Sequence, residues 1–471
     1  MRKPVLCVKS VVTSCVAAVA MLLCITAIRP GIAQAVGADD SVVELNIYAI
    51  NDFHGAVKSG VQSVDAYEAG DYTTQGHILI NVPGAAVVAG AIKQFKQTQD
   101  NVMFVSAGDN RQGNFTNASE QAFAKGLIAA GLQCGTVGNH DLKFDDGDGG
   151  DDEVFNAQQA EKPYTSTGFY GAKVGLDAKT GVLAKNDGRN YGLSSNFKRK
   201  GVADADQPFG DACVVPTAAG VKVAFVGATV GHEGGSVDLG ELDSSDNYKV
   251  ATKPQTIEQF YDNWVMKRYD IESNYVKPVE KVADKLKSDK AADVVVALVH
   301  DGSYGKDLDE VVNERRLEMC RYNKEYDRGN IGATLDKKCK DKDVKTRSFD
   351  TPLRELIQSK DANIDSLITA HTHYAYNYTY TTGVLNNGQI EQKTRGIVQG
   401  RAGGLDLSHT KIKFDKTQGK VQSIETELVP MMSADGKPLY QPDATVQRVV
   451  DHPNSYILPK DGNKPDYPVK K

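Results

Sequence analysis

The sequence predicts a mixed α/β fold with an added β-rich portion towards the C-terminus. Up to about residue 370, short apolar runs rich in β-branched residues alternate with segments whose apolar residues recur every three or four positions. From residue 396 onward the pattern changes to strand after strand, with no internal repeat. The 471 residues, 40% hydrophobic and 25% charged, suffice for one large domain or two medium ones with a sizeable core.

The first half of the chain supplies three strands and two helices. Residues 85–97 carry apolar side chains on one helical face, and Ser119 with acidic Glu120 behind it is typical of a capped helix start. Strands are expected at residues 43–50, 102–106 and 134–137, and helices at residues 85–97 and 119–130.

The same alternation resumes in the second half. Strands are expected at residues 222–229, 294–300 and 364–370, a helix at residues 276–288, and further strands at residues 396–399, 407–414 and 421–429. We therefore expect one domain over residues 42–430, followed by a polar, proline-bearing tail over residues 431–471.

The N-terminus has the pattern of an export signal. Arg2, Lys3 and Lys9 precede an apolar run at residues 11–28, and a small-x-small cleavage site ends at Ala35. An uncleaved anchor is the alternative, because 18 residues lie at the edge of spanning length. Polar residues within the run favour cleavage after Ala35. We expect a secreted, periplasmic or cell-surface protein with no stable membrane span once the signal is removed.

The charge balance limits the class of partner. The whole chain carries −6, and its first 35 residues hold four basic and no acidic side chains, so the remainder carries −10. This argues against a protein that binds nucleic-acid polymers. Small anionic substrates remain compatible, because metal ions can supply local positive charge.

Four cysteines follow the signal, an even number that allows three pairings in an exported chain. Cys320 and Cys339 flank a charged segment with little apolar content, so we expect a disulfide at the base of a surface loop. Cys134 lies in an apolar stretch, where a buried free thiol and a bridge are equally compatible with the sequence. Cys213 is the fourth.

Histidine, aspartate and asparagine follow five of the predicted strands at the point where each ends. In open α/β sheets, ligand sites gather at the carboxyl ends of strands. Mixed His and Asp ligands suit zinc, manganese or iron, and an Asn oxygen is tolerated. The five motifs are Asn51-Asp52-Phe53-His54-Gly55, Ser106-Ala107-Gly108-Asp109-Asn110, Gly138-Asn139-His140-Asp141, Val299-His300 and Ala370-His371-Thr372-His373. Each alone carries little information, but the set predicts two adjacent divalent metals that promote attack on a phosphate ester.

At these motifs the chain resembles the calcineurin-like metallophosphoesterase superfamily, and specifically its exported 5′-nucleotidase branch. The opening Asn-Asp-Phe-His-Gly is that branch's version of the first motif, and residues 108–113, a helix and residues 136–141 follow its layout. The resemblance runs from about Leu45 to Val429. It implies a catalytic domain with a four-layer α-β-β-α sandwich of two mixed sheets.

The resemblance also implies roles for individual residues. His140 would stabilise charge on the phosphate and help the leaving oxygen depart, oriented by a carboxylate, and a hydroxide between the metals would attack phosphorus. Asn139 would touch the phosphate too. The implied ligands are Asp52, His54 and His373 for one metal, Asn139, His300 and His371 for the other, and Asp109 bridging both.

Three features depart from the family pattern. Ala370 replaces the glycine that opens the last motif. Lys143 stands where the family has the aspartate that partners the catalytic histidine, so Asp141 or Asp145 would have to serve. Full-length relatives carry a C-terminal domain that stacks the base and supplies arginines, whereas this chain ends about 40 residues after the catalytic domain. Arg111 is a candidate replacement, although an ordinary surface position fits it better.

The sequence therefore predicts an exported dinuclear-metal phosphoesterase acting on a small phosphorylated substrate. Nucleoside 5′-monophosphates are the expected class, and cyclic nucleotides, nucleotide sugars or other small phosphoesters are the alternatives. A non-catalytic exported binding protein on the same fold is a further alternative, but every ligand position is filled. The tyrosines at 374, 376, 378 and 380 have strand spacing and fit a sheet face better than a base-stacking platform. No oligomeric state is predicted.

Overall fold

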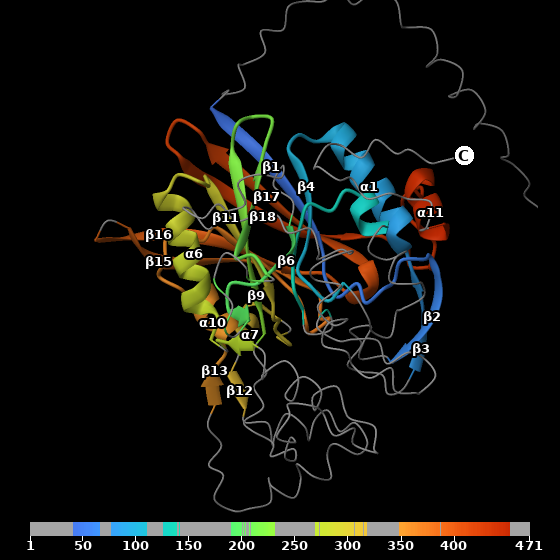
Figure 1. Cartoon of the computed structure of the whole chain (residues 1–471), viewed down its shortest axis with the longest axis horizontal. Coiled ribbons are helices and arrows are strands. Elements are labelled where there is room, and N and C mark those ends of the chain that lie inside the picture. The colour runs from blue at the N-terminus through green and yellow to red at the C-terminus, as the bar shows by residue number, and fades with distance from the viewer. Residues whose placement is uncertain are drawn as a thin grey trace, which may run out of the picture. The chain divides into compact units, whose positions relative to one another are not determined.

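The computed structural model describes most of the chain after residue 40 and centres on two six-stranded sheets (Figure 1). The residues described are 41–65, 77–110, 126–138, 141, 190–199, 201, 203, 207, 209–230, 269–272, 274–305, 307–313, 315–317, 348–386 and 388–452. Within this part, no helix is both long and apolar enough to cross a membrane.

The first sheet combines parallel and antiparallel strands in the order β18-β17-β1-β4-β5-β6. Its parallel part begins with β1 and continues through β4 and β5 to β6, and β17 and β18 add antiparallel strands to the other side of β1. The bounds are β1 (Val42–Ile50), β4 (Val102–Ser106), β5 (Cys134–Thr136), β6 (Asn190–Leu193), β17 (Asp406–Asp415) and β18 (Lys420–Pro430).

The second sheet is also mixed, with the order β15-β16-β14-β11-β9-β8. Four central strands run parallel, and the two edge strands β15 and β8 are antiparallel to their neighbours. The bounds are β8 (Ala212–Pro216), β9 (Lys222–Thr229), β11 (Val294–His300), β14 (Ser366–Thr369), β15 (Tyr376–Asn386) and β16 (Gln389–Gln399).

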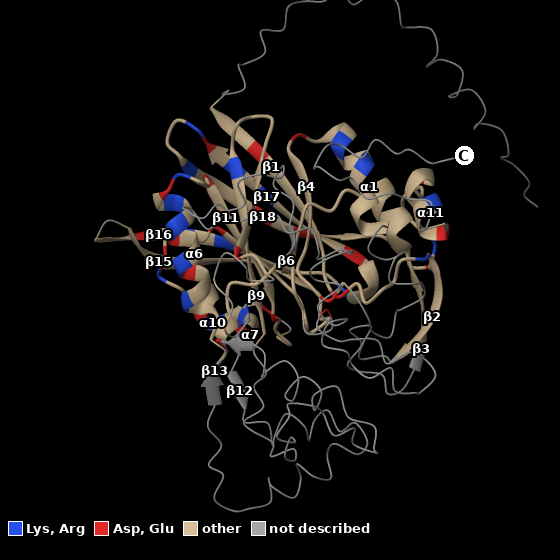
Figure 2. Cartoon of the chain, viewed as in Figure 1, with Lys and Arg blue, Asp and Glu red and all other residues tan. Residues whose placement is uncertain are grey.

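Three buried apolar clusters define the layers. Alternate residues of a strand point to opposite faces; accordingly Leu45 of β1 packs against the second sheet, while Tyr48 packs under the helices α1 (Gly84–Thr98) and α11 (Ala444–Asp451). A third cluster lies between the second sheet and the helices α6 (Val276–Ser288), α7 (Leu308–Val312) and α10 (Pro352–Ile357). Lysines lie along α1, and charged residues of both signs lie along α6 and α11 (Figure 2). The predicted four-layer α-β-β-α sandwich is confirmed.

Short elements complete the described part. A β2–β3 hairpin follows β1, and a single 3-10 turn, η4, precedes β17. The bounds are β2 (Gly60–Asp65), β3 (His77–Val82), β7 (Phe197–Arg199), β10 (Tyr269–Ile271), β12 (Arg315–Leu317), β13 (Ser348–Asp350) and η4 (Ala402–Gly404).

The packed structure continues beyond the expected start of the polar tail. Met431 is fully buried, and Val446, Val449 and Val450 form the buried face of α11 against the cluster under α1. The side chain of Asp443 caps this helix. The polar composition predicts a tail from residue 431, but three valines at helical spacing make residues up to 452 part of the fold.

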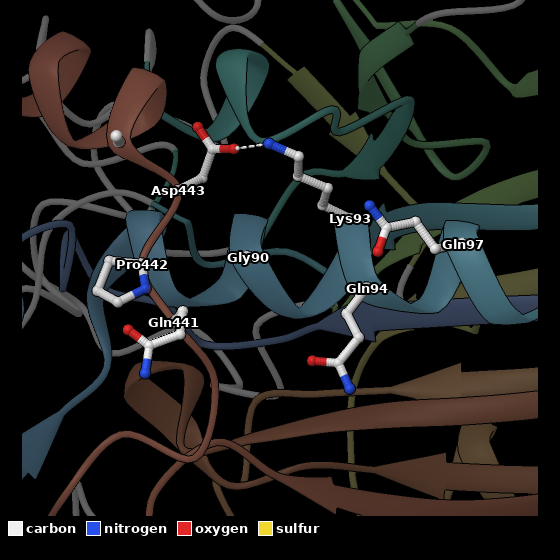
Figure 3. Close-up of a pocket in the computed structure, with 8 residues that line it drawn as sticks. Gly90, Lys93, Gln94, Gln97, Gln441, Pro442 and Asp443 are labelled. Atoms are coloured by element: carbon white, nitrogen blue, oxygen red, sulfur yellow. Dashed lines mark hydrogen bonds and ion pairs between the residues drawn. The ribbon is translucent and has the colours of Figure 1, made fainter.

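A shallow pocket lies between α1 and the segment that leads into α11 (Figure 3). At its edge Lys93 Nζ forms an ion pair with Asp443 Oδ2 at 3.0 Å. Gly90 lies so close to the neighbouring segment that a Cβ atom there would be 1.9 Å from the Gln441 oxygen. None of the site residues expected from the sequence lines this pocket, so we regard it as the seam where the C-terminal segment packs on α1.

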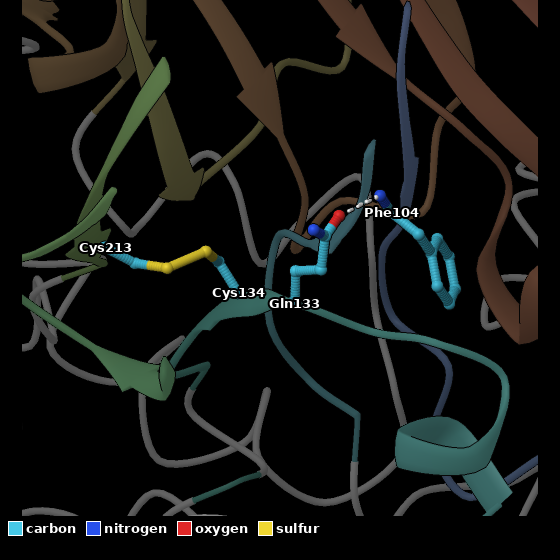
Figure 4. The surroundings of a disulfide bond; sticks show 4 residues. All are labelled: Phe104, Gln133, Cys134 and Cys213. Atoms are coloured by element: carbon cyan, nitrogen blue, oxygen red, sulfur yellow. Dashed lines mark hydrogen bonds between the residues drawn. A yellow bond between two sulfur atoms is a disulfide. The ribbon is translucent and has the colours of Figure 1, made fainter. Parts of the chain in front are cut away.

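A disulfide joins the two sheets through the central core (Figure 4). Cys134 of β5 and Cys213 of β8 are both fully buried in the cluster between the sheets. The sequence left open whether Cys134 was a free thiol or bridged, and the structure shows the bridge. The predicted Cys320–Cys339 disulfide lies outside the described residues.

Candidate metal centre

Six of the seven predicted metal ligands lie among the described residues, and the fold brings all six together in two groups. β1 and β4 of the first sheet deliver Asp52, His54 and Asp109, whereas β11 and β14 of the second sheet deliver the other three histidines. Within each group, the ligand atoms lie within 4.8 Å of one another. The groups are Asp52, His54 and His373, and Asp109, His300 and His371.

The first group is buried and compact. The Nε2 atoms of His54 and His373 face each other at 3.0 Å. Asp52 Oδ1 lies 3.4 Å from His373 Nε2 and 4.0 Å from His54 Nε2. Two imidazole nitrogens and a carboxylate oxygen thus lie close together. A proton or a cation between them is needed to offset the repulsion of their lone pairs.

The second group adjoins the first through Asp109. Its Oδ2 atom lies 3.1 Å from His300 Nε2 and 3.9 Å from His54 Nε2 of the first group. The rings of His300 and His371 meet edge to face, with centroids 5.3 Å apart. Asp109 therefore faces both groups with one carboxylate.

Ligand residues hold unusual backbone conformations. Five of the seven non-glycine residues with positive φ in the described part are candidate ligands, with φ between 46° and 75°. Such conformations cost on the order of 1–3 kcal/mol each and persist where the surrounding structure enforces them, often at functional sites. The five are Asp52, His54, Asp109, His371 and His373.

Backbone hydrogen bonds fix the two ligand loops of the first sheet against each other. The amide of Asp52 donates to the Gly108 oxygen at 3.0 Å, and the amide of His54 donates to the Asp109 oxygen at 2.9 Å. Because β1 and β4 are parallel neighbours, their loops leave the sheet side by side and can be joined in this way.

Further hydrogen bonds orient the ligand side chains. The amide of His371 donates to both carboxylate oxygens of Asp52, at 3.0 and 2.9 Å, and Asn51 Nδ2 donates to Asp52 Oδ2 at 2.8 Å. Nδ1 of His300 donates to the Ala107 oxygen at 3.0 Å, which leaves Nε2 directed at Asp109. Second partners of this kind set the tautomer and orientation of metal ligands.

The electrostatics of the site favour added positive charge. Burial acts to raise the pKa of Asp52, but the neighbouring His373 and His300 together outweigh it and hold that pKa below its ordinary value. Burial acts to lower the pKa of His300, but the Asp109 carboxylate outweighs it and raises that pKa to about 9. The buried carboxylates thus draw protons onto the imidazoles, as they would draw a cation.

Asp141 joins two loops. Its Oδ1 accepts from the Asn110 amide at 3.0 Å and its Oδ2 from the Gly138 amide at 2.9 Å. Gly138 is needed here, because a Cβ atom would lie 2.1 Å from Asp109 Oδ1. Asp141 was a candidate partner of His140; the structure gives it this loop-joining role, and the partner of His140 stays a prediction.

Four of the candidate site residues lie outside the described residues. They are Asn139, His140, Asp145 and Arg111. The tyrosine series is described: Tyr376 is buried, and Tyr374, Tyr378 and Tyr380 pack partly buried against the cluster under α6, as a sheet face does.

The donor set fits a pair of divalent metals. Each group offers imidazole nitrogens and a carboxylate oxygen, a mixture that suits zinc, manganese or iron. The carboxylates have buried partners that orient them, and the shared Asp109 suits two ions at short range. The structure thus shows two clusters able to hold metals.

Gln399 received no role from the sequence patterns, yet it is fully buried behind the ligand loop of the second sheet. It stands at the carboxyl end of a strand, as the ligand motifs do. That position was the available signal, but a lone glutamine carries too little information to be recognised.

Comparison with known proteins finds similarity in structure only. No protein-family model and no curated protein matches the chain. Among solved structures, the chain is similar to the calcineurin-like phosphoesterase YfkN from Bacillus subtilis, at 16% identity and a TM-score of 0.49, over 88% of this chain and 98% of that one.

Two nucleotidases are also similar. The 5′-nucleotidase precursor from Thermus thermophilus matches at 14% identity and a TM-score of 0.48, over 88% of this chain and 59% of its own length. The NAD nucleotidase of Haemophilus influenzae matches at 14% identity and a TM-score of 0.43, over 88% of this chain and 56% of its own. The chain spans less than two thirds of these two proteins. At such distances no substrate is carried over.

Proposed function

We propose that this protein is a dinuclear-metal phosphoesterase. The observation that carries the proposal is the pair of adjacent His/Asp groups, delivered by strands of both sheets and sharing Asp109. In this assignment Asp52, His54 and His373 would hold one divalent ion, His300 and His371 with Asn139 would hold the other, and Asp109 would be shared by both.

The chemistry follows from that assignment. When bound there, a pair of divalent ions would supply a water nucleophile of lowered pKa and would neutralise charge on the phosphoryl oxygens. The chain's own residues fix the site: the Ala107 carbonyl sets the tautomer of His300, and the His371 amide and Asn51 hold Asp52. His140 is assigned to the departing oxygen, with Asn139 beside the phosphate.

Strain at the ligand residues argues against a purely structural use of the fold. Left-handed conformations at five non-glycine ligands cost free energy and place polar atoms in a buried site. A protein that kept the fold only as a scaffold and held no metal would gain nothing from that arrangement. The strain therefore supports a working metal site, and the resemblance of the motifs to phosphoesterases leads us to prefer an enzyme to a binding protein.

Nucleoside 5′-monophosphates are the proposed substrates, on the resemblance of the motifs to the exported 5′-nucleotidase branch. Cyclic nucleotides, nucleotide sugars and other small phosphoesters are the second candidates. We also propose that the protein is exported. The signal-like N-terminus supports this, and so does the buried Cys134–Cys213 disulfide, since disulfides form mainly outside the reducing cytosol.

A purified chain that begins after Ala35 tests the reaction. It should contain about two divalent metals per chain and hydrolyse p-nitrophenyl phosphate or its bis-ester with added Mn²⁺, and chelation should abolish turnover. A folded protein with two bound metals and no hydrolysis of either ester contradicts the proposal. A panel of nucleotides, cyclic nucleotides and nucleotide sugars, compared by kcat/KM, then identifies the substrate class.

A further inference from the structure

Gln399 is a fully buried glutamine at the end of β16, directly behind the second-sheet ligand loop. Its Nε2 donates to Thr372 Oγ1 at 2.7 Å and to the Tyr374 oxygen at 2.8 Å. Its Oε1 accepts a longer bond from Tyr376 Oη at 3.4 Å. The carboxamide therefore meets a partner at both its nitrogen and its oxygen.

The two Nε2 bonds fall on either side of a candidate ligand. Thr372 lies between His371 and His373, which have φ of 75° and 59°, and Tyr374 follows directly. Thr372 Oγ1 in turn donates to the Ser303 oxygen at 2.9 Å, in the loop that leaves His300. Gln399 thus braces a strained loop at two points.

Gly400, the residue after Gln399, helps to hold Asp52 of the first sheet through Asn51. The Gly400 amide donates to Asn51 Oδ1 at 3.0 Å, and Asn51 Nδ2 donates to the Gly400 oxygen and to Asp52 Oδ2, each at 2.8 Å. Consecutive residues at the end of β16 therefore contact the neighbours of His373 and of Asp52, two members of one ligand group.

We propose that Gln399 is a positioning residue for the metal held by Asp52, His54 and His373. The inference rests on the proposed function, and it concerns how the chain prepares one of the two ion sites. By bonding both neighbours of His373, Gln399 keeps that imidazole opposite His54 at the 3.0 Å separation of their Nε2 atoms. The second ion site gains less from it, because Gln399 bonds only one neighbour of His371 and because His300 is held by Ala107.

Glutamine suits this task for a chemical reason. Two acceptors, a threonine hydroxyl oxygen and a main-chain carbonyl, require two N–H donors, and a carboxamide nitrogen supplies both. A methionine of similar length would fill the space without donating. Residues that orient metal ligands typically change metal affinity or activity about 10–100-fold when replaced.

The test compares metal binding by Gln399→Met and wild type. Metal-free proteins are titrated with Co²⁺, followed by calorimetry and by the visible absorption of the bound ion. We expect one of two Co²⁺ ions to bind about 10–100-fold more weakly, with an altered spectrum, and the other to bind nearly as before. The matched control is Gln392→Met, at an exposed position of the same strand, which should match wild type.

The outcomes separate positioning from general destabilisation. A lower melting temperature with unchanged Co²⁺ affinities and spectrum overturns the proposal. Turnover that recovers when Mn²⁺ is raised supports it, because the defect then lies in occupancy. If Gln399→Met fails to fold, Thr372→Val serves instead. It removes one of the two hydrogen bonds from Gln399 Nε2 and should weaken the binding of the same Co²⁺ ion.

Wild type distinguishes this inference from the proposed function. A wild-type protein that binds two Co²⁺ ions but hydrolyses no phosphoester contradicts the function, while the comparison with Gln399→Met still decides positioning. A wild type that binds no metal overturns both.

Discussion

β11 and β14 begin in one cluster of buried charge and end in another, and the two clusters are built in opposite ways. At their amino ends lie Asp365, Lys393 and Arg395, and at their carboxyl ends lie His300 and His371. The strands between the two clusters are fully buried. The charges of each cluster therefore have to be compensated by nearby groups.

The amino-end cluster is complementary within itself. Asp365 accepts from Lys393 Nζ at 2.7 Å and from the Val295 amide at 2.8 Å. Burial acts to raise the pKa of Asp365, but Lys393 and Lys287 outweigh it and hold that pKa below its ordinary value.

Arg395 completes this end. It is fully buried, and its guanidinium donates to four main-chain carbonyls. They belong to Ile357, Ser359, Asp361 and Ile364.

At the carboxyl ends, similar atoms face each other instead. The Nε2 atoms of His54 and His373 approach to 3.0 Å, and the ligand residues hold left-handed conformations. A buried cluster whose charges and hydrogen bonds are all paired internally supports the fold. A buried cluster that holds ligand atoms close together on a strained backbone is instead prepared to bind a cation. The same strands therefore carry a structural cluster at their amino ends and the candidate metal site at their carboxyl ends.

Loss of the shared carboxylate should have the largest effect. In Asp109→Asn an amide replaces the charge that faces both ligand groups, so two cations would repel without compensation. We expect kcat/KM to fall more than about 10³-fold, equivalent to about 4 kcal/mol, together with loss of bound metal by elemental analysis. Retention of both metals with full turnover would refute the bridging role.

The matched change at the amino end is Arg395→Met. It leaves four buried carbonyls without their donor, and we expect a loss of about 3–5 kcal/mol in the free energy of unfolding. The folded variant should still hold two metals per chain. If its metal content falls as far as that of Asp109→Asn, the two ends do not divide support from function as the contrast suggests.

The sequence predicted the strands and helices that are marked by an unbroken local pattern of apolar residues. Residues 102–106, 222–229 and 294–300 are strands and 276–288 a helix with the predicted bounds, because buried β-branched runs and a helical apolar face are local signals. Most of β15, by contrast, was not expected, because its polar, partly exposed residues show no apolar run. In the site, the candidate ligands follow from the motifs, but the positive φ of non-glycine candidate ligands and the hydrogen bonds of Gln399 arise from tertiary contacts that no local pattern records.

Removal of the inter-sheet disulfide should have an intermediate effect. Cys134 and Cys213 are 79 residues apart in sequence, and bridges of that kind typically stabilise by about 2–4 kcal/mol. The double variant Cys134→Ala/Cys213→Ala should therefore unfold at lower denaturant concentration. Its metal content should persist under native conditions, because both cysteines lie in the apolar cluster between the sheets and neither belongs to a ligand group. Midpoints that match those of the reduced wild type would support the effect; midpoints equal to the oxidised wild type would contradict it.

The smallest effect on stability is expected at Asp361, where the amino-end cluster places carboxylates near one another. Burial raises the pKa of the Asp361 carboxyl to about 6, and the charges of Asp284 and Glu280 add to the shift. Between pH 4 and 6 the folded protein holds a proton that the unfolded chain, with a carboxyl pKa near 3.8, has released. Stability therefore falls as pH rises through this window, and the penalty is complete above it.

Asp361→Asn removes that penalty and keeps an oxygen for the Asn363 amide, which donates at 2.6 Å. The variant should gain on the order of 1 kcal/mol at pH 8, a modest value because solvent screens a partly exposed carboxyl, and almost nothing at pH 4. Urea unfolding at the two pH values measures the difference. Asp289→Asn, at an exposed carboxylate paired with Lys285 at 2.8 Å, is the control and should bring no gain. An equal gain at both pH values would show that the stabilisation comes from the amide's hydrogen bonds and not from relief of charge repulsion.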